Sequence, residues 1–339
     1  MQVSIQAEIA IFHLRNITIY GEYSLVVLKN WGLVLEVKRL RLLWELSARG
    51  TVAAVAEALN YTPSAVSQQL SILERESGVP LLRKAGRRLE LTAAGEALVA
   101  ETETLLAAIE HAEAELARAS STVAGDIRVA AFQTAVLTLM PGALRSLRTA
   151  YPGLRVSMVQ FEPELGLHET WARAFDLVVA EQYPGHAAPH FARLDREPLM
   201  NDPIHLAIPP QDGAFGSIEG IADAADLPWV MEPRGAASRH WAEQACRSAG
   251  FEPDVRYETA DLQAHVRLVE SGNAVALLPG LVHGVFAPRV QLVALDGDPY
   301  RTIFTSSRRS RGSHPAIAAV RAALDDEART RPWPLSGHF

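Results

Sequence analysis

The feature that most constrains the fold of this 339-residue chain is the stretch 51–76, TVAAVAEALNYTPSAVSQQLSILERE. Thr51 is a favourable N-cap, and apolar residues then recur at the spacing of one helix face: Val52, Val55, Ala56 and Leu59. The helix ends at Asn60. Thr62 and Pro63 begin a second helix, because threonine caps well and proline suits the first helical position. Two short helices joined by a tight turn are typical of a helix-turn-helix motif.

The two faces of the second helix differ in chemistry. Its apolar face carries Val66, Leu70 and Leu73, whereas the other face is small, polar and nearly uncharged. Small hydrogen-bonding side chains suit base edges in the major groove of DNA. We therefore expect five residues to face bases: Thr62, Ser64, Ala65, Ser67 and Gln68. The alternative is an ordinary helical hairpin with a polar surface.

The flanking sequence favours the DNA-binding interpretation. Upstream, apolar residues predict a helix that completes a three-helix core: Leu40, Leu43, Trp44 and Leu46. Downstream, residues 81–91 predict two short strands joined by a basic turn, which is the wing of a winged helix. We expect Arg83, Arg87 and Arg88 of this wing to contact phosphates, since guanidinium groups pair well with them.

The charge of the chain is unevenly distributed. A net charge of −7 by itself argues against a nucleic-acid partner. However, residues 36–92 hold nine Lys or Arg and six Asp or Glu, a net +3, and residues 1–35 are balanced, which leaves −10 for the rest. A basic head on an acidic body fits a DNA-binding domain attached to a domain that does not bind DNA.

In order and spacing, these residues resemble the LysR-type transcriptional regulators. The similarity is carried by residues 40–43, 53–59, 62–70, 73–74, 78–83 and 91–95, and extends more loosely to about residue 329. It implies a winged helix-turn-helix, a long linker helix that dimerises, and a two-lobed α/β effector-binding domain of the periplasmic-binding-protein type. Many members carry Arg or Lys where this chain has Gln68, so a phosphate contact is missing here or Gln68 reads adenine instead.

Residues 93–120 predict one long helix, which Thr92 caps. Apolar residues recur along it at coiled-coil spacing: Leu98, Leu105, Ile109 and Leu116. The opposite face is acidic: Glu96, Glu101, Glu103, Glu110, Glu113 and Glu115. A thin apolar stripe favours a seam between two helices over a globular core. We expect a homodimer or tetramer assembled through this seam. The alternative is a core helix of one domain.

Beyond Asp126, strand and helix patterns alternate, which predicts parallel sheets with crossover helices. The alternation restarts after Asp202-Pro203, and the last strand and helix (301–305 and 315–329) are expected to return to the first lobe. Two such lobes enclose a cleft, because ligands of open α/β sheets bind beyond the carboxyl ends of the strands.

Two loops that open helices are candidates for the ligand site. Gln133 and Thr134 follow the first strand, where free N–H groups and a hydroxyl suit an anion, although Thr134 also suits a plain helix cap. Arg234 and Ser238 occupy the corresponding loop of the second lobe, where Arg234 pairs with a ligand carboxylate or stays solvated. These loops together predict an anionic effector.

The family resemblance implies two further effector contacts, near Glu181 and Asp261. Glu181 does not suit an anion site, so it favours an amine-bearing ligand or faces solvent. We expect no catalytic residues, metal or cofactor, because the chain lacks a Gly-rich phosphate loop, a His-Glu zinc motif and a Gly-x-Ser-x-Gly elbow. The single cysteine, Cys246, indicates a reducing compartment and a buried thiol, with a redox sensor as the alternative.

These patterns predict five segments: an extension (1–33), the winged helix-turn-helix (34–92), the linker helix (93–120), the effector-binding domain (121–329) and a tail (330–339). The extension lacks the pattern of a signal peptide or a membrane span, so it is either a misplaced translation start or an N-terminal arm. We expect a cytoplasmic regulator that binds double-stranded promoter DNA, a small effector and itself, but no membrane. The alternatives are an extracytoplasmic solute-binding protein and a metabolic enzyme on the same two-lobed fold.

Overall fold

The computed structural model describes residues 35–86, 88–120, 122–210, 215, 217–283 and 289–330. Its internal contacts divide the chain into two compact units, residues 1–107 and 108–339. The predictions for residues 1–33, for the tail beyond residue 330 and for Arg87 lie outside the described residues, as does the side chain of Arg88. Within the described ranges, no helix combines the length and the apolar composition needed to cross a membrane.

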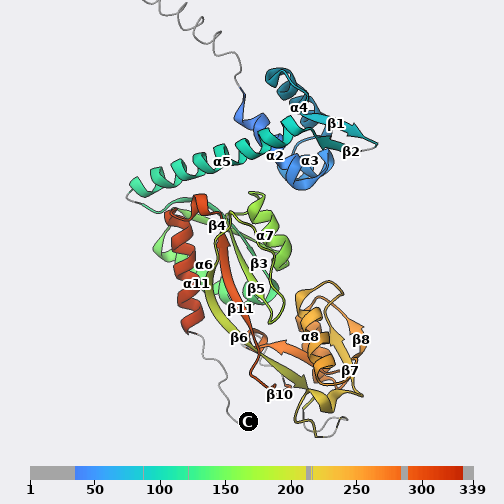
Figure 1. Ribbon diagram of the computed structural model, residues 1–339. Coiled ribbons are helices and arrows are strands. Elements are labelled where there is room, and N and C mark those ends of the chain that lie inside the picture. The colour runs from blue at the N-terminus through green and yellow to red at the C-terminus, as the bar shows by residue number, and fades with distance from the viewer. Residues whose placement is uncertain are drawn as a thin grey trace, which may run out of the picture. The chain divides into compact units, whose positions relative to one another are not determined.

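The first unit is the predicted winged helix-turn-helix (Figure 1). Its three helices, which share one apolar core, are α2 (Val37–Arg49), α3 (Val52–Leu59) and α4 (Pro63–Ser77). Both predicted caps are confirmed, because the backbone N–H of Ala54 donates to Thr51 Oγ1 and that of Ala65 to Thr62 Oγ1, each at 3.2 Å. Asn60 between the helices adopts a left-handed conformation with φ 56°, which asparagine tolerates better than most residues.

The wing is held in place by residues on both sides of it. Strands β1 (Leu82–Ala85) and β2 (Arg88–Leu91) pair antiparallel. The Glu74 carboxylate of α4 accepts hydrogen bonds from the N–H groups of Leu81 and Leu82 at 2.9 and 3.0 Å. Thr92 then caps the long helix α5 (Ala93–Ala119). Gly95 in its first turn has to be glycine, because a Cβ atom there would lie 2.2 Å from the Leu81 carbonyl oxygen.

The second unit is built on a seven-stranded mixed sheet in the order β10-β6-β11-β5-β3-β4, with β9 beside β6. The first lobe contains β3 (Gly125–Ala131), α6 (Gln133–Ala150), β4 (Leu154–Gln160), α7 (Pro163–Trp171), β5 (Leu177–Gln182), β11 (Tyr300–Ser307) and α11 (Pro315–Thr330). Strand β11 pairs with β5 and α11 packs on α6, which confirms that the C-terminal segment returns to this lobe (Figure 1).

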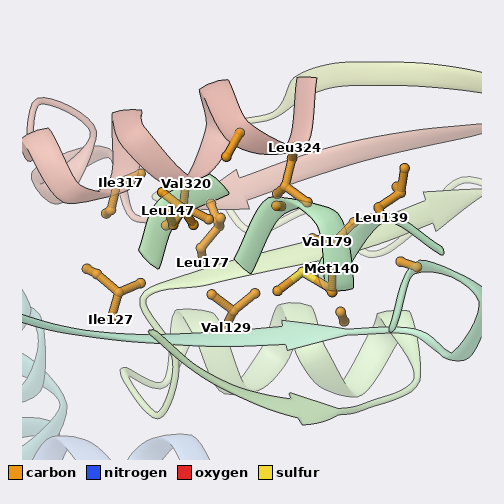
Figure 2. Close-up of a cluster of buried hydrophobic side chains, with 14 of the residues drawn as sticks. Ile127, Val129, Leu139, Met140, Leu147, Leu177, Val179, Ile317, Val320 and Leu324 are labelled. Carbon is orange, nitrogen blue, oxygen red and sulfur yellow. The ribbon is translucent and has the colours of Figure 1, made fainter. Parts of the chain in front are cut away.

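The sheet of the first lobe is covered on both faces, and its strands alternate accordingly. Ile127 and Val129 of β3 point into the layer of α6 and α11, as Figure 2 shows with Leu139, Val320 and their neighbours. The intervening Ala130 packs instead with Leu167 of α7. Since successive strand residues face opposite sides, a strand buried on both faces needs an unbroken apolar run, and residues 127–131 and 177–180 are close to that pattern.

The second lobe contains β7 (Pro228–Met231), α8 (Ala237–Ser248), β8 (Asp254–Glu258), α9 (Leu262–Glu270), β9 (Ala276–Pro279) and β10 (Gln291–Val293). Strand β6 (Glu197–Ile208) runs through both lobes, pairing first with β11 and then with β9 and β10. The expected break after Asp202-Pro203 is therefore wrong. The chain tolerates Pro203 inside a strand because its missing N–H falls where β6 leaves β11 and meets β9.

Candidate functional site

The outward face of α4 is the first candidate site. Val66, Leu70 and Leu73 are buried in the domain core, as the helix periodicity predicts. The residues predicted to face bases lie on the other side: Thr62, Ser64, Ser67 and Gln68 are exposed and Ala65 is half-buried. The Thr62 hydroxyl is already used in part, since it accepts the capping bond and lies 3.0 Å from Ser64 Oγ. Of the five residues predicted to face bases, Gln68 has the largest polar side chain.

The wing provides the second part of a DNA-binding surface. Arg83 of β1 lies opposite Glu90 of β2 and forms an ion pair with it at 3.0 Å. Both side chains are exposed, and an exposed pair of this kind stabilises the fold little. The ion pair with Glu90 can therefore give way to a phosphate contact of Arg83 with little loss of folding free energy.

The predicted seam on α5 is only partly free of its own chain. Leu105, Ile109 and Leu116 are exposed, which is unusual for large apolar side chains on one helix. Leu98, by contrast, is half-buried against the core of the first unit. The exposed stripe therefore consists of Leu105, Ile109 and Leu116.

The acidic face of α5 differs from the sequence interpretation at one residue. Glu110 is buried within the second unit, where its carboxylate accepts from Arg308 Nε at 2.8 Å and lies 3.2 Å from Arg173 Nε. Ser310 Oγ donates to the same carboxylate. Burial opposes the charge of Glu110, but these partners outweigh it and hold the pKa of its carboxyl below the usual value. Sequence spacing gave no sign of this, because the partners lie far along the chain.

A cavity of about 280 Å³ lies between the two lobes, a size that suits a small metabolite. We call it the interlobe cavity. On one side it is lined by Glu162, Pro163, Glu164, Leu165, Glu181, Gln182, His186 and Ala188. On the other side it is lined by Glu232, Pro233, Arg234, Gly235, Ala236, Ala237, Ser238 and Ala260. Its walls are thus mainly apolar, with a few polar and charged groups.

An ion network reaches this cavity through Glu181, which is one of the lining residues. Arg301 of β11 is buried, and its guanidinium donates to Asp202 of β6 at 2.8 Å, to Glu181 of β5, and to Thr134 Oγ1 at 2.7 Å. Burial works against its charge, but Glu181 and Asp202 raise the pKa of Arg301 above its usual value. Burial also raises the pKa of Glu181, to about 7, because Arg301 offsets only part of the desolvation and nearby carboxylates add repulsion.

The six predicted effector residues fall into two groups. Glu181, Arg234 and Ser238 line the interlobe cavity. The other three, Gln133, Thr134 and Asp261, are not among its lining residues. Gln133 Nε2 instead donates to Asp261 Oδ1 at 2.8 Å, and the N–H of Leu262 donates to Gln133 Oε1 at 3.1 Å. These two bonds join the lobes directly.

Sequence reasoning missed several residues that shape the cavity. Glu162 occupies the N-cap position of α7 without a side-chain capping bond, and Pro163 occupies the first helical position. A search for helix starts would have found this pair, as it found Thr62-Pro63. Glu232 belongs to the loop already predicted to bind the effector, but its carboxylate, which accepts from Ser238 Oγ, was not given a role. Arg301 left no local signal, because its partners come from three other elements.

Comparison with known proteins gives consistent matches over both units. The family described as "LysR substrate binding domain" matches residues 120–329, and the family described as "Bacterial regulatory helix-turn-helix protein, lysR family" matches residues 37–96. The HTH-type transcriptional regulator TcbR of a Pseudomonas species is 24% identical over 287 residues, covering 84% of this chain and 96% of TcbR. The transcriptional dual regulator GltC of Bacillus subtilis is 26% identical over 256 residues, covering 75% and 84%. In structure, a full-length OxyR from Pseudomonas aeruginosa matches with a TM-score of 0.64 at 18% identity, covering 90% of this chain and 99% of OxyR.

Proposed function

Because this chain belongs to the LysR family of bacterial transcriptional regulators, we propose that it binds a two-part site in double-stranded promoter DNA and responds to a small effector in the interlobe cavity. The observation that carries the DNA-binding part is the outward face of α4. A well-capped helix that presents Ser64, Ser67 and Gln68 beside a basic wing has the chemistry of a major-groove reader.

The exposed stripe of α5 supports self-association. Leu105, Ile109 and Leu116 expose apolar surface along one side of α5, which favours pairing with the same helix of a second copy. A dimer would present two α4 helices to two half-sites, and pairing of dimers would give a tetramer. Because its partner is chromosomal DNA, the compartment that this proposal implies is the bacterial cytoplasm.

The experiment is a selection of binding sites from a random duplex library with the full chain. It should return one sequence family with two related half-sites. Gln68→Ala should then weaken binding to that sequence by about 1–3 kcal/mol and relax the preference at one base pair, with little change in binding to random DNA. Gln263→Ala removes another exposed helix glutamine, from α9, and should change neither.

Two results would count against the proposal. Equal weakening of selected and random duplexes by Gln68→Ala would contradict the orientation of α4. A library that yields no enriched sequence would contradict sequence-specific DNA recognition itself.

A further inference from the structure

The interlobe cavity gathers four carboxylates from three separate parts of the chain. Glu162 and Glu164 come from the start of α7, Glu181 from the end of β5, and Glu232 from the loop after β7. These residues line one partly open cavity, in which Glu162 and Glu164 are exposed at the rim and Glu181 and Glu232 are half-buried, and the rest of the wall is largely apolar. Carboxylates that converge in this way repel one another unless a positive charge lies among them.

The cavity's own positive charges do not balance these carboxylates. Arg234 supplies one full charge, and the first turns of α7 and α8 supply roughly half a charge each. Arg301 adds no net positive charge to this balance, because its guanidinium is paired with Asp202 as well as with Glu181. Even when His186, 3.7 Å from Glu164, is counted as a full charge, the negative side prevails.

The pKa shifts of these groups agree with that balance. Burial raises the pKa of Glu232, which Glu162 raises further, and burial together with Glu164 raises the pKa of Glu162. The carboxyls of Glu162, Glu181 and Glu232 are thus less acidic than they would be in water, and Glu162 and Glu232 both add to the shift of Glu181. The carboxylates of the cavity thus exceed its positive charges, and a positively charged ligand would neutralise the excess.

Building on the regulator function proposed above, we infer that the effector carries an ammonium or guanidinium group. This group lies among Glu162, Glu181 and Glu232 and donates hydrogen bonds to their carboxylate oxygens. An ammonium or guanidinium group suits this position because it only donates hydrogen bonds, whereas an ionised carboxylate only accepts them. The apolar remainder of the effector lies against Leu165 and Ala237. The anionic effector expected from the loop sequences does not suit this cavity, because two of the loop residues, Gln133 and Thr134, are occupied by Asp261 and Arg301.

A set of shape-matched probes tests this inference on the full chain. We expect n-butylamine to show saturable binding by calorimetry in the millimolar range, and butan-1-ol and butanoate of the same length to bind at least tenfold more weakly. A second pair, 1,4-diaminobutane and ornithine, distinguishes a plain amine from an amino acid. Tighter binding of ornithine would mean that Arg234 or a helix start also holds a carboxylate, with the ammonium site unchanged.

Charge-removing variants locate the site. Glu162→Gln and Glu232→Gln preserve side-chain shape, and each should weaken n-butylamine by roughly tenfold, the effect of losing one charged hydrogen-bonding partner. Glu219→Gln removes an equal charge from an exposed position of the second lobe outside the cavity and should have no effect. Glu181 is left intact in these variants, since Arg301 depends on it.

Proton release provides a readout that does not depend on affinity. A cation should lower the raised pKa of Glu181, whose charged and titratable neighbours are Arg301, Asp202, Glu162, Glu232 and Tyr183. Binding near neutral pH should therefore release protons, which calorimetry in buffers of different ionisation enthalpy detects. An anion would instead take protons up.

The outcomes separate this inference from the proposed function. Tighter binding of butanoate than of n-butylamine, no saturable binding of any of the amines, or proton uptake would overturn the cationic effector. DNA binding in the site selection is measured without these probes. A chain that selects a duplex but prefers anions keeps the regulator function and loses only this inference.

Discussion

Replacement of Glu110 tests how the C-terminal part of α5 is attached to the first lobe. Glu110→Ala removes the carboxylate that Arg308 and Arg173 share, although both guanidinium groups are more than nine-tenths buried. Breaking a buried ion pair from one side typically costs about 3–5 kcal/mol. Arg308 keeps Asp176 at 3.6 Å and donates to two backbone carbonyls, so we expect a loss at the lower end, about 3 kcal/mol.

Hydrogen exchange of residues 108–119 measures this loss where it occurs, because it reports the free energy of local opening. Glu110→Gln should cost roughly 1 kcal/mol, since the amide oxygen still accepts a hydrogen bond from Arg308 and the amide N–H group can donate to the Ser310 hydroxyl. Glu113→Ala, at an exposed position of the same helix, is the matched control and should change the opening free energy little. If Glu110→Ala behaved like Glu113→Ala, the buried ion pairs would not hold this part of α5.

The stabilisation that Glu110 contributes should depend on pH in one direction. The pKa of Glu110 is lower in the folded chain than in the unfolded chain, so its contribution is present above the unfolded pKa and is lost as pH falls through the folded pKa. The difference between the wild-type chain and Glu110→Gln should therefore shrink below about pH 4. A difference that stayed constant to lower pH would contradict an ionised Glu110.

Three further substitutions test other parts of the structure. Leu105→Asp puts a charge in the exposed stripe of α5 and should dissociate the proposed dimer in light scattering while leaving the circular dichroism unchanged; a persisting dimer would exclude the stripe as the seam. Thr134→Val leaves one buried N–H of Arg301 without its acceptor and should lower the free energy of unfolding by about 1–3 kcal/mol, measured with urea, although the sequence alone assigned the Thr134 hydroxyl to the effector or to a helix cap. Gln133→Ala removes the direct bonds between the lobes and should speed exchange of the Leu262 amide; unchanged exchange would mean that these bonds are not formed in solution.

The parts that sequence predicted well are those whose causes are local. Thr51, Thr62 and Pro63 determine their helix starts through atoms a few residues away, so capping rules were sufficient. The alternation of strand and helix patterns along the chain likewise predicted the strands of the first lobe. The continuation of β6 through Pro203 was missed, because it depends on which strands pair on each side of that residue.

The same distinction applies to side-chain pairing at the candidate site. Gln133 and Asp261 were each predicted to meet the effector, but nothing in either stretch indicated that they bind each other across 128 residues. Glu110 follows the helical spacing of the exposed glutamates, yet it is buried against Arg308, nearly 200 residues away. Side-chain pairing between distant elements depends on the tertiary fold, so the local patterns of a single sequence do not predict it.

Arg301 shows why such distant pairing matters for the function. Its register partner on the neighbouring strand is Asp202, so one buried ion pair joins β11 to β6, the strand that both lobes share. The same guanidinium also holds Glu181, whose carboxylate lines the cavity. A ligand that changes the charge of Glu181 thereby changes the balance of forces on Arg301, and a buried ion pair with little access to water responds strongly to such a change. Electrostatic coupling through this one side chain thus connects the occupant of the cavity to the strand that links the lobes.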